Sequence, residues 1–130
     1  MIALDTNVLV RLLVSDPNEE LQNKAAKRLL KDSGQVFIPQ IVQVETVWVL
    51  ESAYGFDKTS VIKVLTHLHT HPVFSLQQAQ SFKQALNSYQ NHNADFSDCL
   101  ILAGCNDKKY QLATFDRKLS KLDGVVRVSS

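Results

Sequence analysis

The sequence predicts an α/β domain with a short, mostly parallel β-sheet. Short apolar runs of strand length alternate with longer segments of helical character, the order typical of parallel sheets. Cap and turn residues separate the two kinds of segment. The chain has 130 residues, enough for one domain with its own core, so we expect a single domain over residues 1–130.

The expected elements follow from apolar runs and their boundaries. In chain order they are strand 2–4, helix 8–14, helix 17–32, strand 36–38, helix 39–54, helix 58–69, a helix from 79, helix 98–107, strand 112–114 and strand 125–128. Asp16 is expected to cap the second helix, with Pro17 at its first position and Glu19 completing a capping box. Gly34 and Gly55 are expected to end helices.

The second half of the chain has similar boundary signals. Asp57 is expected to cap a helix that ends before Pro72, and Ser97 to cap the helix over 98–107. Ser75 and Gln78 form a second capping-box pair. Behind them, apolar residues recur on one helical face, which predicts a buried stripe. The stripe comprises Ala79, Phe82, Leu86 and Tyr89.

Composition excludes several classes of protein. Apolar residues make up 45% of the chain and charged residues 21%, which is ordinary for a globular protein and excludes a disordered one. The net charge of +1 argues mildly against a protein that coats nucleic acid but is neutral toward a nuclease. The four glycines are scattered, so there is no Gly-rich loop of a P-loop nucleotide binder.

The cysteines and histidines offer little metal chemistry. Cys99 and Cys105 lie in an apolar, helix-like run and suit two free thiols better than a disulfide. His67, His69 and His71 alternate near a helix end; a zinc site there is conceivable, although this spacing spreads side chains apart on a helix. We find no leader peptide and no run of about 20 apolar residues, so we expect a cytoplasmic protein without membrane contact.

Four acids stand where elements begin or end. Asp5 follows the first strand directly, Asp98 opens an apolar helix, and Asp116 lies two residues past a strand. Ligands of α/β sheets bind beyond the carboxyl ends of the strands, so we expect Asp5 and Asp116 to meet at that edge. Glu45 sits in a helix so apolar that we expect it to be buried and in need of a compensating cation.

Each acid also has a purely structural interpretation. Asp98 suits the start of a helix, where the helix dipole favours an acid. Asp5 could belong to a capping segment, and Asp116 to a turn with Arg117. Glu45 is harder to explain in this way, because no basic residue occurs between Lys31 and Lys58.

Taken together, these motifs resemble the PIN-domain family over essentially the whole chain. The resembling segments are Ile2-Ala3-Leu4-Asp5-Thr6-Asn7, the helix with Glu45, Asp95-Phe96-Ser97-Asp98-Cys99-Leu100-Ile101-Leu102-Ala103, and Leu112-Ala113-Thr114-Phe115-Asp116. The size is similar to that of VapC-type toxins. The resemblance implies a three-layer α/β/α sandwich, Mg²⁺ or Mn²⁺ dependence, RNA as substrate, a homodimer and a small antitoxin partner.

The resemblance also implies roles for single residues. Asp5, Glu45, Asp98 and Asp116 would be catalytic, with Asp5 and Asp98 binding the metal. Oxygen ligands of this kind suit Mg²⁺ better than His or Cys would. Asn7, Thr114 and Asp95 would support them, Asp95 as an outer-shell acid or a cap. Arg117 and Lys118 are candidates for contacting RNA.

Two rival functions remain. The first is a PIN fold that binds RNA or protein without cutting, which retention of all four acids disfavours. The second is an α/β phosphotransferase with Asp5 as nucleophile, but position 7 is Asn where such an enzyme would want a second acid.

Overall fold

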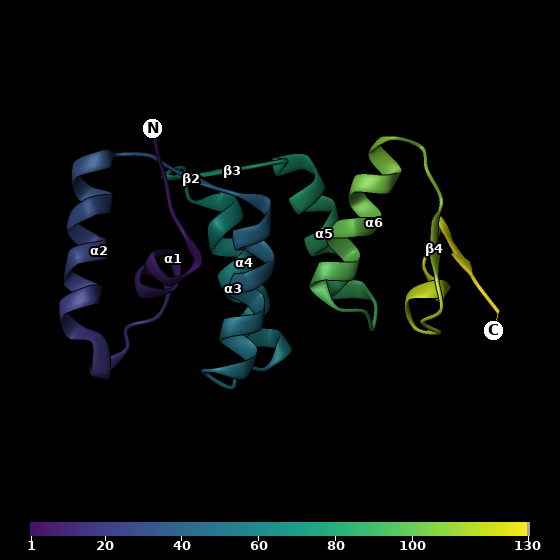
Figure 1. Ribbon diagram of the computed structural model, residues 1–130, viewed down its shortest axis with the longest axis horizontal. Helices are drawn as coiled ribbons and strands as arrows, with labels where there is room; N and C mark the ends of the chain where they lie inside the picture. The colour runs from purple at the N-terminus through teal and green to yellow at the C-terminus, as the bar shows by residue number, and fades with distance from the viewer. Residues whose placement is uncertain (130) are drawn as a thin grey trace. The chain divides into compact units, whose positions relative to one another are not determined.

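The computed structural model describes residues 1–129 (Figure 1). It divides into two compact units, Met1–Gln77 and Gln78–Ser130. No helix within the described residues is long and apolar enough to cross a membrane.

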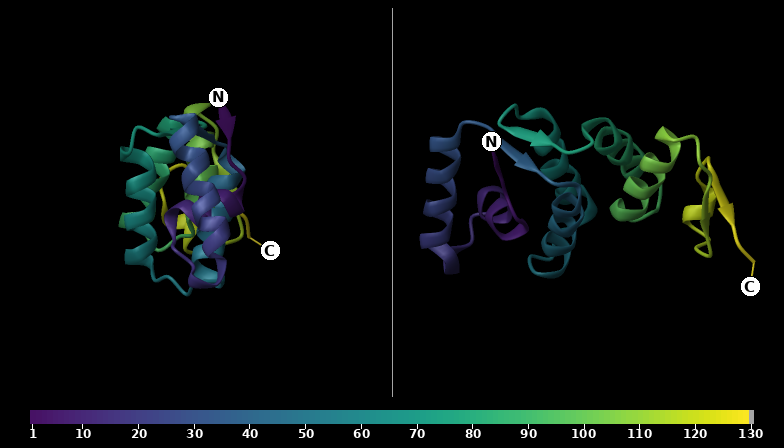
Figure 2. Two further views of the ribbon diagram at one scale, coloured as in Figure 1. Left: turned by 90° about the vertical axis from the view of Figure 1, so that its left-hand side faces the viewer. Right: turned by 45° about the horizontal axis from the view of Figure 1, so that its top comes forward.

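The first unit is built on a three-stranded parallel sheet. Strand β2 (Val36–Ile38) lies between β1 (Ile2–Ala3) and β3 (Phe74–Leu76). Ile2 pairs with Val36, and Phe37 with Ser75. Only Pro39 separates β2 from the next helix, and the right-hand view of Figure 2 shows this direct passage. As an edge strand, β1 leaves Ile2 45% exposed.

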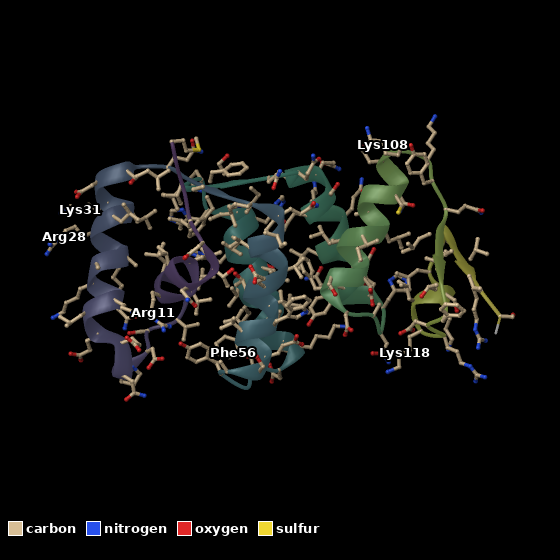
Figure 3. The ribbon with its side chains drawn as sticks, in the orientation of Figure 1. Arg11, Arg28, Lys31, Phe56, Lys108 and Lys118 are labelled. Carbon is tan, nitrogen blue, oxygen red and sulfur yellow. The ribbon has the colours of Figure 1, made fainter. Side chains whose placement is uncertain are left out.

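Four α-helices complete this unit. They are α1 (Thr6–Leu13), α2 (Glu20–Ser33), α3 (Gln40–Ser52) and α4 (Lys58–Thr70), with a 3₁₀ turn at Pro17–Glu19 before α2. Helix α1 packs against α2 and α3, and α3 against α4. Leu9, Leu50 and Leu65 are fully buried, and each stabilises the fold by about 1.5–3 kcal/mol. The cations Arg28 and Lys31 project from α2 on the side away from α1 (Figure 3).

Most of the expected boundaries in this unit are confirmed. Asp57 accepts a hydrogen bond from the backbone N–H of Ser60 at 2.8 Å, and Gly34 has a φ of +77°. Asp16 accepts one from the N–H of Asn18 at 2.9 Å, but it caps the 3₁₀ turn and not α2. The expected start of α2 at Pro17 and its capping box are wrong, because α2 starts at Glu20 with Glu19 as its N-cap residue and no side-chain cap bond. The capping-box pair at Ser75 is wrong, because Ser75 lies inside β3. We had expected no strand there.

The second unit joins two helices to a two-stranded sheet. Helices α5 (Ala79–Asn91) and α6 (Phe96–Asp107) pack together, with the rings of Phe82 and Phe96 edge to face at 5.6 Å. Of the expected stripe on α5, Phe82, Leu86 and Tyr89 are buried and Ala79 is exposed. Strands β4 (Leu112–Thr114) and β5 (Val125–Arg127) pair in parallel on either side of a 3₁₀ turn at Leu119–Lys121.

The cap of α6 differs from the expectation. Ser97 does not cap the helix, since α6 starts at Phe96 and Asp95 is the N-cap residue. All strands of residues 1–129 pair in parallel and are joined through helices or turns, so the α/β class with a parallel sheet is confirmed.

Candidate functional site

Asp5 combines a structural contact with an available carboxylate oxygen. It follows the buried Leu4 at the end of β1, and its Oδ1 accepts a hydrogen bond from the backbone N–H of Val8 at 3.0 Å. The capping interpretation is therefore correct. The bond also orients the exposed carboxylate, and within residues 1–129 no hydrogen bond is made to Oδ2, which can therefore bind a cation.

Glu45 lies beside the start of α1. The hydroxyl of Thr6, next to Asp5 in the chain, donates to Glu45 Oε1 at 3.0 Å. The expectation that α3 buries Glu45 is wrong: the carboxylate is exposed. The fully buried polar positions of α3 are Gln43 and Thr46. The need for a compensating cation, argued from burial, therefore falls away, and Thr6 is a functional candidate that we did not single out.

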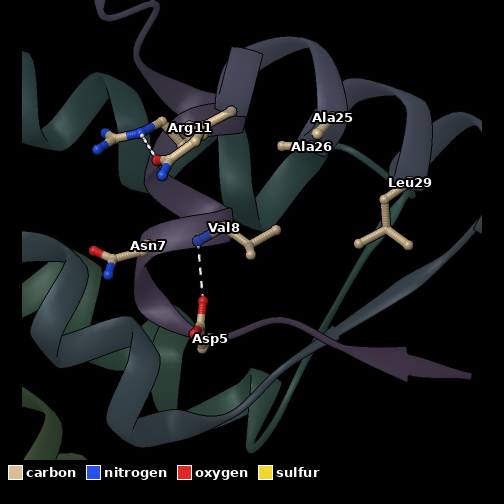
Figure 4. A pocket seen from close by; sticks show the side chains of 8 residues that line it. Asp5, Asn7, Val8, Arg11, Ala25, Ala26 and Leu29 are labelled. Atoms are coloured by element: carbon tan, nitrogen blue, oxygen red, sulfur yellow. Dashed lines mark hydrogen bonds between the residues drawn. The ribbon is translucent and has the colours of Figure 1, made fainter. Parts of the chain in front are cut away.

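Asp5 and Asn7 also line a pocket between α1 and α2. We call it the α1–α2 pocket, and its volume is about 330 Å³ (Figure 4). Asn7 is exposed, and no hydrogen bond joins it to a carboxylate within residues 1–129. Its supporting role is thus not visible as a direct contact. The full lining is Asp5, Asn7, Val8, Arg11, Gln22, Ala25, Ala26 and Leu29.

In the second unit, the Asp98 carboxylate lies within electrostatic reach of two other acids, Asp95 and Asp116. Asp98 lies in the first turn of α6, three residues after the N-cap residue Asp95. Partial burial raises the pKa of Asp98 above its usual range, and the negative charges of Asp95 and Asp116 raise it further. The structure therefore brings Asp95 and Asp116 close enough to repel the carboxylate of Asp98.

Asp116 is held by its own turn. The Asp116 N–H donates to Thr114 Oγ1 at 3.0 Å, and Asp116 Oδ1 accepts from the N–H of Leu119 at 3.0 Å. The Thr114 hydroxyl thus holds the backbone of Asp116 and not the Asp116 carboxylate. Arg117 and Lys118 follow directly and are exposed, which is compatible with contact to a polyanion.

The acids fit a hard divalent cation better than a soft one. Mg²⁺ is usually held by one or two carboxylates and keeps several waters, so it requires no preformed protein cage. No group of three or more His, Cys, Asp or Glu side chains within the described part of the chain is arranged to hold a metal. The Asp98 carboxylate is half-buried and is repelled by two like charges. A bound cation would therefore stabilise its charged form more than that of the other acids.

The structure of residues 1–129 shows no arrangement of metal-binding side chains at the histidines for which a zinc site was considered. The rings of His67 and His71 meet edge to face at 5.3 Å, and both contact the ring of Phe74. His71 Nδ1 accepts a hydrogen bond from the N–H of Val73 at 3.2 Å. These rings therefore pack at the end of α4. Cys99 and Cys105 form no disulfide bond within residues 1–129, as expected.

Comparisons with known proteins agree with the arrangement of these motifs. A family model described as PIN domain matches residues 2–125. A curated relative, the VapC ribonuclease of Aquifex aeolicus (strain VF5), is 25% identical over 126 residues, which cover 94% of this chain and 92% of the relative. No solved structure matches the chain.

Proposed function

Because the chain belongs to the PIN domain family, we propose that it is a metal-dependent endoribonuclease, the toxin of a toxin–antitoxin pair. The observation that carries this proposal is the half-buried Asp98 carboxylate beside Asp95 and Asp116. Repulsion between these carboxylates destabilises the protein while no cation is bound. A cation that normally binds there would explain why the three acids lie together. Similarity to a protein named VapC ribonuclease supports RNA as the substrate.

Asp5 and Asp98 would hold Mg²⁺, with Mn²⁺ as a substitute. When bound, the ion activates a water and stabilises the leaving oxygen of the phosphodiester. Asp5 is suited to this role because its cap bond to Val8 fixes one oxygen and leaves the other exposed. Asp95 would not bind the metal directly, and its carboxylate would add a negative charge beside the site.

The remaining acids would handle water and protons. Thr6 holds Glu45 by Oε1, so Oε2 can orient the attacking water and accept its proton. The carboxylate of Asp116 has one oxygen on the N–H of Leu119 and would bind site waters with the other. Arg117 and Lys118 would bind phosphates of the RNA. We also propose a small antitoxin that blocks the site, a homodimer and a cytoplasmic location.

Metal binding tests the proposal independently of the RNA target. Mn²⁺ is titrated by calorimetry into the wild type, Asp98→Asn, and Asp107→Asn, an exposed acid at the end of the same helix. We expect Asp98→Asn alone to weaken binding at least about tenfold. RNA cleavage follows with the same three proteins. If the wild type binds no Mn²⁺ at millimolar concentration, the nuclease proposal fails and a binding module without catalysis becomes the better account.

A further inference from the structure

The α1–α2 pocket has an apolar wall that the catalytic proposal does not use. Val8 points from α1 toward α2, where Ala25, Ala26 and Leu29 face it (Figure 4). The two alanines keep this wall open, because a longer side chain at either position would extend into the space. Asp5, one of the proposed metal ligands, lines the same pocket. An occupant would therefore lie next to the reacting phosphodiester.

Two polar side chains of the pocket, Arg11 and Gln22, are held by hydrogen bonds. Arg11 Nε donates to Gln22 Oε1 at 2.9 Å, and Arg11 Nη1 donates to the Tyr54 hydroxyl at 2.8 Å. That hydroxyl donates in turn to Asp16 Oδ2 at 2.9 Å. Because Gln22 Oε1 is held by Arg11, the direction of the Gln22 Nε2 amide group is fixed as well. This amide is then a positioned hydrogen-bond donor beside an apolar wall.

Charge and size favour a small neutral occupant. The pocket contains one carboxylate, Asp5, and one guanidinium, Arg11, so it selects neither an anion nor a cation. Its volume of about 330 Å³ lies at the lower end of the range for small-molecule sites, about 300–1,000 Å³. One heterocycle with part of its sugar fits this space.

We propose that the α1–α2 pocket receives one nucleobase of the RNA substrate, next to the cut phosphodiester, and thereby selects the cleavage sequence. This inference rests on the proposed function. The base ring lies against Val8, Ala25 and Leu29, and Gln22 Nε2 donates to an acceptor on its edge. Single-stranded RNA is recognised in this manner, by apolar contact with the ring and hydrogen bonds to the edge.

The outer face of α2 is suited to the strand that carries this base. Its exposed cations are Lys24, Lys27, Arg28 and Lys31. Arg28 and Lys31 project away from α1 (Figure 3). They can bind RNA phosphates without entering the pocket. Helix α2 would then contact the sugar-phosphate backbone of the RNA with its outer face and a base with the face that lines the pocket.

The test is a cleavage profile on a pool of single-stranded RNA with random sequence, in Mn²⁺. The proteins are the wild type, Ala25→Leu, which fills the pocket, and Ala53→Leu, the same change at an exposed position outside it. The measured quantity is the ratio of cleavage at preferred and disfavoured bases beside the cut. We expect Ala25→Leu to reduce that ratio about tenfold. Ala53→Leu should keep the wild-type ratio.

Gln22→Glu provides a second variant that is independent of packing. It keeps an oxygen for Arg11 but replaces the Nε2 donor with an acceptor, so we expect the identity of the preferred base to change. An unchanged ratio and an unchanged preferred base would overturn the inference and leave the pocket to a protein partner. A fall in the cleavage rate that is equal at all sequences would overturn the inference too, because the pocket would then not select bases.

The calorimetric titration separates this failure from failure of the proposed function. A wild type that binds Mn²⁺ and cuts RNA with no base preference refutes the pocket inference alone. A wild type that neither binds Mn²⁺ nor cuts RNA refutes the function, and the inference falls with it. Melting curves of all variants confirm that each is folded before its profile is compared.

Discussion

Substitution of Asp5 separates its helix-capping role from its proposed metal role. Asp5→Ala removes both the acceptor for the Val8 N–H and a carboxylate of the site. Asp5→Asn keeps the acceptor, because Asn caps a helix about as well as Asp, but it removes the negative charge. The two variants should therefore differ in stability and agree in metal binding.

The magnitude follows from one hydrogen bond of 3.0 Å at the start of α1. Loss of an N-cap acceptor costs about 1 kcal/mol, with a range of about 0.5–2 kcal/mol. For a chain of 130 residues, 1 kcal/mol corresponds to a fall in melting temperature of about 3–5 °C. We expect Asp5→Ala to show this fall in metal-free buffer and Asp5→Asn to stay within about 1 °C of the wild type.

The assay is thermal unfolding with and without Mn²⁺. A metal at one hundred times its dissociation constant stabilises a protein by about 2.7 kcal/mol, so the wild type should melt higher with Mn²⁺. Both variants should lose most of that gain. If Asp5→Asn keeps the full gain, Asp5 is not a metal ligand. If Asp5→Asn is as unstable as Asp5→Ala in metal-free buffer, the capping argument is wrong.

Three further predictions follow from single contacts. Because the pKa of Asp98 is raised in the fold, its contribution to stability is fully present below the usual carboxyl pKa and is lost as pH rises through the raised value. Metal-free Asp98→Asn should therefore be more stable than the wild type at pH 7, with a difference that vanishes near pH 4 in urea unfolding; an equal difference at both pH values would contradict this. Thr6→Val removes the donor to Glu45, so RNA cleavage at saturating Mn²⁺ should fall about tenfold with little change in metal affinity, and an unchanged rate would leave Thr6 without a role. Gly124→Ala should lower the free energy of unfolding in urea by about 1–2 kcal/mol, since Gly124 has a φ of +85° and an added Cβ would lie 3.0 Å from Asn106 Oδ1. In the matched control Gly104→Ala, the added Cβ would have no atom of the described residues outside its own helix turn within 4 Å, so this change should instead stabilise α6 by about 0.5–1 kcal/mol.

The helix ends could be predicted because their signals are local. Asp57 and Gly34 act within three or four residues of themselves, and the structure confirms both. Asp16 does form a cap bond, but with the 3₁₀ turn that precedes α2, so its signal placed the start of that helix three residues too early. Strand β3 could not be predicted in this way. It has only three residues, too few to show a period, and it forms because β2 lies beside it, 38 residues earlier at the pair Val36 and Phe74.

The failure at Glu45 has a different cause. Helix α3 is apolar on several sides, so periodicity does not show which side faces the core. The structure leaves Ile41 71% and Trp48 55% exposed and buries Gln43 completely. Glu45 lies on the same helical face as Ile41 and Trp48, at spacings of four and three residues. Its partner Thr6 is 39 residues away in the chain, so no local pattern could have identified the contact.

The local geometry of an acid does not distinguish a cap from a catalytic group. Asp5, Asp57 and Asp116 each accept a hydrogen bond from the N–H three residues on, at 3.0, 2.8 and 3.0 Å. Only Asp5 and Asp116 are proposed to be catalytic. A cap bond therefore argues neither for nor against a role in the site, and it can orient a carboxylate for both purposes.

Asp98 differs from these three acids in a way that bears on function. No cap bond to its carboxylate is formed within residues 1–129, and its pKa is raised, whereas the cap bond of Asp57 lowers the pKa of that residue. A partly buried carboxylate that accepts no cap bond within residues 1–129 and is repelled by two neighbours destabilises the fold at neutral pH. The stability cost at Asp98, rather than the positions of the capped acids, is therefore the strongest physical reason to expect a cation in this protein.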